Sequence, residues 1–174
     1  DIIRGCQKMD RKAQKMLYER YSPILFGMAM RYASCKSEAE DMLQEAFINI
    51  FKHIKQFKGH GSFEGWMKRI LINAAIGYIR KYKKHINDNF DEIQEIQIKD
   101  VSFDEKDFTK EELLKAINEL PEGFRLVFNL YAIEGYKHRE IADMLEIQVG
   151  TSKSQYSRAR KILMNKLQEL SKMP

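Results

Sequence analysis

The side chains best able to do chemistry in this sequence are four histidines, two cysteines and a dense set of lysines and arginines. The histidines are scattered without the spacing of metal ligands, at His53, His60, His85 and His138. Cys6 and Cys35 form no CxxC pair, so neither a zinc site nor a disulfide framework is indicated. An enzyme needs a converging set of acid, base, nucleophile or metal ligands. We therefore expect no catalytic residues, no metal and no cofactor.

The cations gather most clearly on a helix that is predicted to open near Gly150. Its apolar stripe comprises Tyr156, Ala159, Leu163, Leu167 and Leu170, and its opposite arc carries Lys153, Ser154, Ser157, Arg158, Arg160 and Lys161. Lysine and arginine contact phosphates and read guanine edges, and serine is short enough for close approach. A short helix over 138–145 and a brief turn precede it, which is helix-turn-helix spacing. The alternative is an ordinary solvated basic helix.

Charge divides the chain into three blocks. Residues 1–84 hold 17 Lys and Arg against 8 Asp and Glu, a net of +9, and residues 85–109 hold 2 against 8, a net of −6. Residues 110–174 hold 11 against 9. A basic block suits a polyanionic partner such as nucleic acid, although it also suits a solvated surface.

Helical periodicity predicts how these side chains are positioned in the first block. The first stripe comprises Cys6, Met9, Ala13, Met16 and Leu17. A cap at Ser22 with Pro23 predicts a second helix, whose inward residues are Ile24, Leu25, Met28, Ala29 and Tyr32. A capping box of Ser37 and Glu40 opens the third helix, with the stripe Ala39, Met42, Leu43, Ala46, Phe47, Ile50, Phe51 and Ile54. After a break over 58–61, Ser62 caps a fourth helix with Phe63, Trp66, Met67, Ile70, Leu71, Ala74 and Tyr78 in its core stripe.

The rest of the chain predicts an extended acidic linker and a second helical module. Residues 85–109 show no sustained period. Helical signals return at Thr109, break at Pro121 and stop at Gly135. We expect an all-α fold of two small helical modules, 1–84 and 110–174, joined by the flexible linker 85–109. No run of about 18 apolar residues and no secretion signal is present, which favours a cytoplasmic protein without membrane insertion.

Both modules contain motifs in a recognisable order. In the second module these are 120–128 (LPEGFRLVF), 134–136 (EGY), 140–142 (EIA), 150–151 (GT), 153–154 (KS) and 158–160 (RAR). In the first they are 39–41 (AED), 44–45 (QE), Phe47, Phe63, Trp66, 69–70 (RI), Asn73 and Arg80. The chain resembles the extracytoplasmic-function (ECF) group of sigma-70 family factors, the promoter-recognition subunits of bacterial RNA polymerase. The resemblance covers nearly the whole chain.

The resemblance implies a role for each surface. Binding to the basic coiled coil of the beta-prime subunit of core polymerase falls on Asp41, Gln44 and Glu45. Binding to the melted −10 strand falls on Phe57, Lys58, His60, Asn73, Arg80, Lys81, Lys83 and Lys84. Binding to the −35 duplex falls on Tyr131, Thr151, Lys153, Ser154, Gln155, Ser157, Arg158 and Lys161. Further implied partners are the beta flap of the polymerase and a membrane-bound anti-sigma factor, and the acidic linker is expected to thread the RNA channel.

Three residues depart from the family pattern. Gly77 stands where many relatives carry a polar side chain, often Asp. Ser152 stands where many carry valine on the buried stripe, so we expect lost apolar burial or a local backbone hydrogen bond. Gln155 stands where arginine is frequent, and an amide there can pair with adenine.

Two other classes of protein remain open on sequence grounds. A helix-turn-helix regulator would bind duplex DNA without polymerase, usually as a two-fold dimer. A sigma-like sequestering protein would bind its partner but fail to start transcription.

Overall fold

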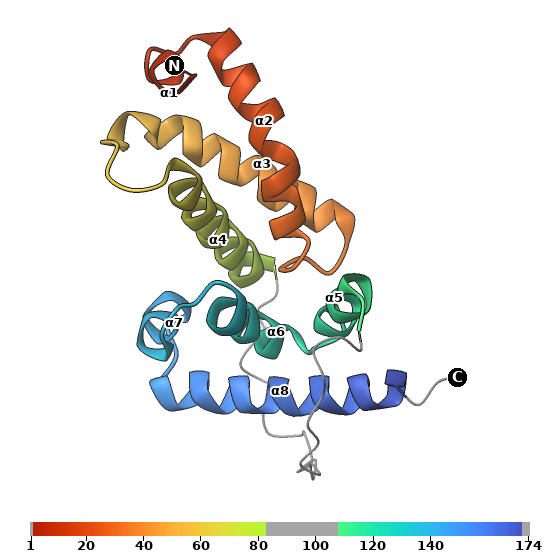
Figure 1. Ribbon diagram of the computed structural model, residues 1–174. Coiled ribbons are helices and arrows are strands. Elements are labelled where there is room, and N and C mark those ends of the chain that lie inside the picture. Colours follow the sequence, from red (N-terminus) through yellow and green to blue (C-terminus); the bar gives the residue numbers. More distant parts are fainter. Residues whose placement is uncertain (1, 83–107, 172–174) are drawn as a thin grey trace. The chain divides into compact units, whose positions relative to one another are not determined.

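The structure, a computed structural model, describes residues 2–82 and 108–171 (Figure 1). These residues form helices, turns and loops and contain no strand, which confirms the predicted all-α fold. The chain separates into two compact units, Asp1–Lys83 and Lys84–Pro174. Most of the predicted linker 85–109 lies outside the described residues. No helix in the described ranges is long and apolar enough to cross a membrane.

Unit 1 is built from four α-helices and a short 3-10 turn. They are α1 (Ile2–Gln7), α2 (Arg11–Ala29), α3 (Lys36–His53), η1 (Ile54–Gln56) and α4 (Phe63–Tyr82). The predicted stripe of the third helix is confirmed, since Ala39, Met42, Leu43, Ala46, Phe47 and Ile50 are all buried. These side chains pack against α2 and α4, which contribute buried Leu17, Leu25, Met67 and Leu71. Helix α3 is therefore the centre of this unit.

The N-terminal helix is shorter than its periodicity predicted. Met9 has a φ of 64° and is exposed, so the stripe from Cys6 to Leu17 is interrupted. The amide of Asp10 donates to the Gly5 carbonyl (3.1 Å) and that of Met9 to the Cys6 carbonyl (2.9 Å), a Schellman arrangement that ends α1. The Asp10 carboxylate then accepts from the Ala13 amide at 2.9 Å and starts α2.

Two predicted helix starts in unit 1 were wrong. Pro23 lies inside α2 and does not open a new helix. Both Pro23 and Glu19, whose carbonyl loses its i+4 donor, are exposed, so water can solvate that carbonyl. Ile24, which was expected to point inward, is also exposed, because it lies on the solvent-facing side of α2. Helix α3 begins at Lys36, where the Ser34 amide donates to Glu38 (2.8 Å) in place of the expected Ser37 and Glu40 box.

The loop between α3 and α4 contains two glycines in the left-handed conformation and ends at a capping residue that starts α4. Gly59 and Gly61 have φ values of 79° and 83°, which L side chains rarely adopt. Ser62 accepts a hydrogen bond from the Gly65 amide at 3.2 Å, as the predicted cap requires. The exposed tip of the loop is thus formed by 58–61.

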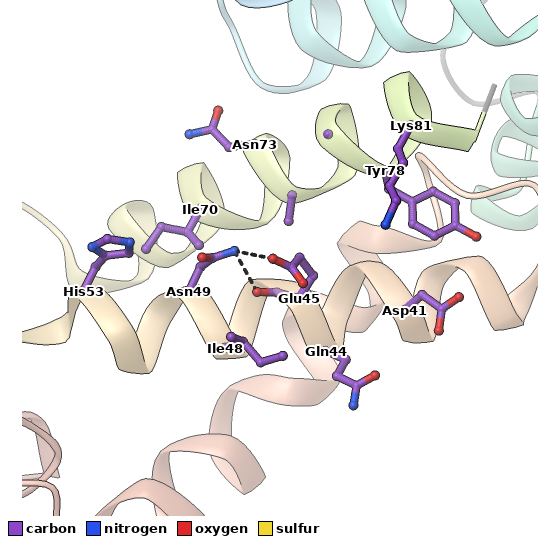
Figure 2. A pocket seen from close by; sticks show the side chains of 12 residues that line it. Asp41, Gln44, Glu45, Ile48, Asn49, His53, Ile70, Asn73, Tyr78 and Lys81 are labelled. Atoms are coloured by element: carbon purple, nitrogen blue, oxygen red, sulfur yellow. Dashed lines mark hydrogen bonds between the residues drawn. The ribbon is translucent and has the colours of Figure 1, made fainter. Parts of the chain in front are cut away.

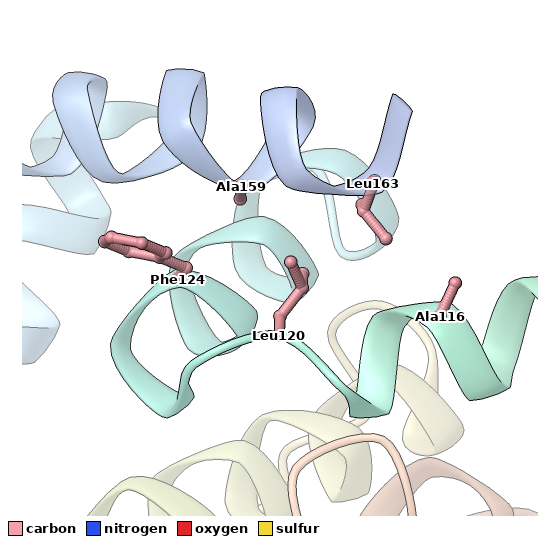
Figure 3. Packing of buried hydrophobic residues seen from close by; sticks show 5 residues of the cluster. All are labelled: Ala116, Leu120, Phe124, Ala159 and Leu163. Atoms are coloured by element: carbon pink, nitrogen blue, oxygen red, sulfur yellow. The ribbon is translucent and has the colours of Figure 1, made fainter. Parts of the chain in front are cut away.

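The described part of unit 2, residues 108–171, forms five helical segments. They are α5 (Lys110–Asn118), α6 (Glu122–Phe128), the π-helical η2 (Asn129–Ile133), α7 (His138–Leu145) and α8 (Val149–Ser171). Thr109 and Glu112 form a capping box, and these hydrogen bonds lower the pKa of the Glu112 carboxyl. The core cluster comprises Ala116, Leu120, Phe124, Ala159 and Leu163 (Figure 3). The predicted break at Pro121 and the short helix over 138–145 are confirmed.

The packing of α1 on α2 depends on a glycine, which gives a test of unit 1. A Cβ at Gly5 would lie 2.5 Å from the Ala13 Cβ, whereas one at Gly27 would meet nothing within 4 Å. We expect Gly5→Ala to destabilise unit 1 by about 1–3 kcal/mol through overpacking. Gly27→Ala, the matched control in the last turn of α2, should stabilise it by about 0.5–1 kcal/mol. Urea unfolding followed by fluorescence of Trp66, the single tryptophan, measures both. A Gly5→Ala variant as stable as the parent chain would contradict the close packing.

Candidate protein and nucleic-acid interfaces

A groove of about 710 Å³ runs between α3 and α4 (Figure 2). Asp41, Gln44 and Glu45 line its α3 side, and all three are exposed. The spacing i, i+3, i+4 places them on one face of the helix, opposite the buried stripe. The structure therefore brings the three predicted core-binding residues together on one surface.

Glu45 is held in a defined orientation by a neighbour that the sequence analysis missed. The Asn49 side-chain amide donates to the Glu45 carboxylate and to the Glu45 carbonyl, both at 3.0 Å (Figure 2). Within the described residues, the carboxylates of Asp41 and Glu45 form no ion pair, although Lys81 also lines this groove. A basic helix or loop is the chemical complement of this surface.

A second groove, of about 600 Å³, lies between α2 and α3, on the other side of the helix face that carries Asp41 and Gln44. Its apolar lining comprises Tyr18, Leu43, Phe47, Ile48 and Phe51. Ile48 borders both grooves and is 55% exposed. The sequence analysis did not predict this apolar groove, although an isoleucine on the polar face of the third helix could have indicated it. The exposed face of α3 is therefore an acidic ridge with an apolar flank.

The loop after α3 divides its predicted DNA-binding residues into two kinds. Lys58 and His60 are exposed at the tip. Phe57 is half-buried, with its ring centroid 5.0 Å from that of Phe63 and 5.5 Å from that of Trp66. The ring of Phe57 thus supports the loop from below. This leaves Lys58 and His60 as the side chains free to meet a ligand.

The exposed face of α4 continues from this loop toward the helix C-terminus. Asn73, Arg80 and Lys81 are exposed, and Asn73 and Lys81 also line the α3–α4 groove. Gly77 lies on the same face with open space around its Cβ position. Arg69, which the sequence analysis did not predict as a DNA contact, is exposed one turn before Asn73. Lys83 and Lys84 lie outside the described residues.

Helix α8 carries most of its predicted residues where a ligand can reach them. Lys153, Ser154, Ser157 and Arg158 are exposed, and Thr151 and Lys161 are half-buried. Tyr131, on η2, is 37% exposed.

Gln155 is the exception on α8. Its side chain is 3% exposed, because it shares the inward stripe of Ser152, Ala159 and Leu163. The expectation that Gln155 pairs with an adenine does not agree with this placement. The amide chemistry suggested a base contact, whereas the i, i+3 relation to Ser152 decides the direction of the side chain.

Ser152 makes a hydrogen bond that differs from the expected local backbone bond. Its hydroxyl lies 3.0 Å from Nδ1 of His138, which joins the start of α7 to the buried side of α8. The His138 ring stacks on Tyr131 with centroids 4.2 Å apart and planes at 12°, and Tyr131 also contacts Tyr156 at 4.5 Å. Burial and the charge of Lys153 lower the pKa of His138. The folded helix-turn-helix therefore favours the neutral form of the His138 imidazole.

This placement makes the stability of unit 2 depend on pH. Because the folded pKa of His138 lies below the ordinary value of about 6.5, the unfolded chain takes up the proton first as pH falls. The contribution of the neutral His138 to the stability of unit 2 should be fully present above about pH 6.5 and should decline as the pH falls below it. Hydrogen exchange of α7 and α8 amides, corrected for intrinsic rates, should show faster opening at about pH 5.5 than at about pH 7.5. His138→Gln, which cannot titrate, should reduce this difference, and an unchanged difference would contradict the assignment.

Comparison with known proteins matches both units. Residues 17–85 match Sigma-70 region 2, and residues 110–163 match Sigma-70, region 4. The chain is 30% identical to the ECF RNA polymerase sigma-E factor of Haemophilus influenzae, covering 97% of this chain and 95% of that protein. It is also 30% identical to the factor of the same name from Escherichia coli K12, over 97% and 94% of the two chains.

Two solved structures share the fold. The sigma factor RpoE from Bartonella quintana, in complex with the anti-sigma factor NepR, is similar with a TM-score of 0.55 and 23% identity over 88% of this chain and 96% of that one. CnrH, in complex with the cytosolic domain of CnrY, is similar with a TM-score of 0.52 and 19% identity over 97% and 96%. Together, the two region matches in order and the nearly full-length similarity to sigma-E factors show that the chain belongs to the ECF group of the sigma-70 family of RNA polymerase sigma factors.

Proposed function

We propose that this sigma factor docks on core RNA polymerase through the acidic ridge of α3, captures the melted −10 strand with the loop and basic face of unit 1, and reads the −35 duplex with α8. The observation that carries the proposal is the exposure of Asp41, Gln44 and Glu45 on one helix face of a family member. We assign the region 2 module to 1–84, the linker to 85–109 and the region 4 module to 110–174.

The docking surface suits the basic coiled coil of the beta-prime subunit. Asp41 and Glu45 supply two negative charges on neighbouring turns, and Gln44 supplies a neutral donor and acceptor between them. Ile48 adds exposed apolar area at the end of the same ridge. An interface of this composition combines charge complementarity, which sets orientation and association rate, with a small apolar centre.

The −10 strand would run from the α3–α4 loop along α4. Lys58 and His60 meet the strand at the loop tip, and Asn73 offers an amide to a base edge. Arg80 and Lys81 supply phosphate contacts, with Lys83 and Lys84 continuing the charge. In this arrangement Phe57 acts through the loop rather than by stacking on a base.

The −35 element would lie against the basic arc of α8. Lys153, Arg158 and Lys161 serve as phosphate and guanine contacts, while Ser154 and Ser157 permit close approach to the groove. Thr151 and Tyr131 sit at the N-terminal end of the same surface as further phosphate contacts. Gln155 is left out of this surface because it is buried.

The remaining expectations concern partners and setting. The sigma factor RpoE from Bartonella quintana is in complex with the anti-sigma factor NepR, which supports an anti-sigma partner here. We further propose that region 4 contacts the beta flap, that the protein acts in the cytoplasm, and that it works by binding rather than by catalysis, as sigma factors in general do.

The docking assignment is tested by run-off transcription with sigma-free core polymerase on a library of promoters from the same genome. Gln44→Ala combined with Glu45→Ala should weaken core binding by about ten- to a hundredfold and abolish transcripts at limiting protein. Glu19→Ala, an exposed carboxylate on α2, is the matched control and should leave both unchanged. Unaltered core binding in the double variant would remove the docking face. Core binding without initiation would favour a sequestering protein, and duplex binding without polymerase would favour an independent regulator.

The −35 assignment predicts a salt signature. Lys153→Ala should weaken holoenzyme binding to a −35 duplex uniformly across sequences and lower the slope of log affinity against log salt by about one. Lys115→Ala, an exposed lysine on α5, should leave the slope unchanged. Equal slopes for Lys153→Ala and the parent chain would show that this lysine contacts no phosphate.

A further inference from the structure

The helix that precedes the region 2 match makes a long-range contact with the end of α3. Nε2 of Gln7, at the last position of α1, lies 3.2 Å from the carbonyl oxygen of Ile54 and 3.2 Å from that of Phe57. These bonds span 47 and 50 residues of sequence. The match to region 2 begins only at residue 17, so it assigns nothing to α1.

The two acceptors stand where the backbone leaves the helix. Carbonyl groups near a helix C-terminus lack the i+4 amide donor, and a side-chain amide can satisfy them. The Ile54 carbonyl also accepts from the Phe57 amide at 3.2 Å, so Gln7 is a second donor to it. Ile54 opens the turn η1, and Phe57 is its extended exit, with φ −71° and ψ 105°. The Gln7 amide therefore fixes the backbone at both ends of this turn, directly before the loop tip at 58–61.

On its N-terminal side the loop tip follows a backbone restrained by the hydrogen bond from the Phe57 amide to the Ile54 carbonyl and by the two bonds from Gln7. Gly59 and Gly61 adopt left-handed φ values, and glycine has more conformational freedom to lose than any other residue. The exit is fixed by the Ser62 cap, and the Phe57 ring rests on Phe63 and Trp66. With Gln7 in place, the loop is restrained at its entry and its exit.

We infer that Gln7 is a positioning residue for −10 recognition: α1 holds the loop of Lys58 and His60 in the conformation that receives the melted strand. This inference rests on the proposed role of that loop. A loop ordered before binding does not lose that conformational freedom when the strand arrives, so affinity for the strand is higher. The donor chemistry is specific, because only a side chain that offers N–H groups can serve two carbonyl oxygens.

The variants distinguish the hydrogen-bond donors of the Gln7 side chain from its size. Gln7→Met keeps the length and apolar stem but removes both donors, and Gln7→Glu places a carboxylate, which only accepts, against two carbonyl oxygens. Gln14→Ala is the matched control, since Gln14 is a half-buried glutamine on α2. Lys58→Ala combined with His60→Ala tests the loop itself.

The measurement uses holoenzyme assembled from the full chain and core polymerase. The probe is a fluorescein-labelled single strand carrying the −10 segment of a promoter that the run-off assay identifies, read by anisotropy. We expect Gln7→Met to weaken strand binding about five- to tenfold, as expected for losing a pair of hydrogen bonds, and Gln7→Glu to weaken it at least as much. Affinity for core polymerase and for a −35 duplex should change by less than about twofold, within the scatter of a surface substitution.

The outcomes separate the two proposals. Strand binding that falls in the loop variant but not in Gln7→Met would overturn the positioning role and leave the loop assignment standing. Strand binding that is unchanged in the loop variant would remove the −10 assignment and the role of Gln7 with it. A loss of core affinity by the same factor as strand affinity in Gln7→Met would show a merely structural residue, and would also overturn the inference. If Gln7→Glu fails to fold, Gln7→Met alone decides.

Discussion

The burial of one stripe of α3 between α2 and α4 is the constraint on which the rest of unit 1 depends. Ala39 and Ala46 on that stripe are fully buried, and small side chains at such positions let the neighbouring helices approach closely. Once the stripe faces inward, the period of the helix turns Asp41 and Glu45 outward. The same packing sets the direction in which α3 ends, and therefore where the loop after it begins. The proposed docking surface and the loop proposed to bind the melted strand are both consequences of one helix orientation.

Unit 2 meets the analogous requirement with different chemistry. Phe124 and Ala159 are fully buried in its core, so α8 crosses α6 on an alanine and its cationic arc must face away. The angle between α7 and α8 has a second restraint, the hydrogen bond between His138 and Ser152. A valine at this position would offer only apolar contact, whereas a serine fixes a direction. The serine at position 152 thus has a hydrogen-bonding partner in His138, and the stacking of the His138 ring on Tyr131 fixes the position of that partner.

Periodicity predicted the elements whose burial is one-sided, and failed where a single residue decides. The helices α3, α4 and α7 were predicted because each repeats apolar residues over at least two turns. The end of α1 was missed because Met9, not a glycine, takes the left-handed conformation. The continuation of α2 through Pro23 depends on solvent exposure, which the sequence does not display. The burial of Gln155 was missed because its amide suggested a base contact, whereas its position on the inward stripe of α8 determines its exposure.

The missed break at Met9 matters for more than the boundary of a helix. A continuous helix from Cys6 to Leu17 would carry its first turn along the axis of α2 and away from the end of α3. The left-handed residue and the Asp10 cap reverse the chain instead, and Gly5 allows α1 to lie against Ala13. Only this reversal brings Gln7 within hydrogen-bonding distance of Ile54 and Phe57. An unfavourable backbone conformation of about 1–2 kcal/mol therefore persists where it creates a contact between the N-terminal helix and the loop proposed to bind the melted strand.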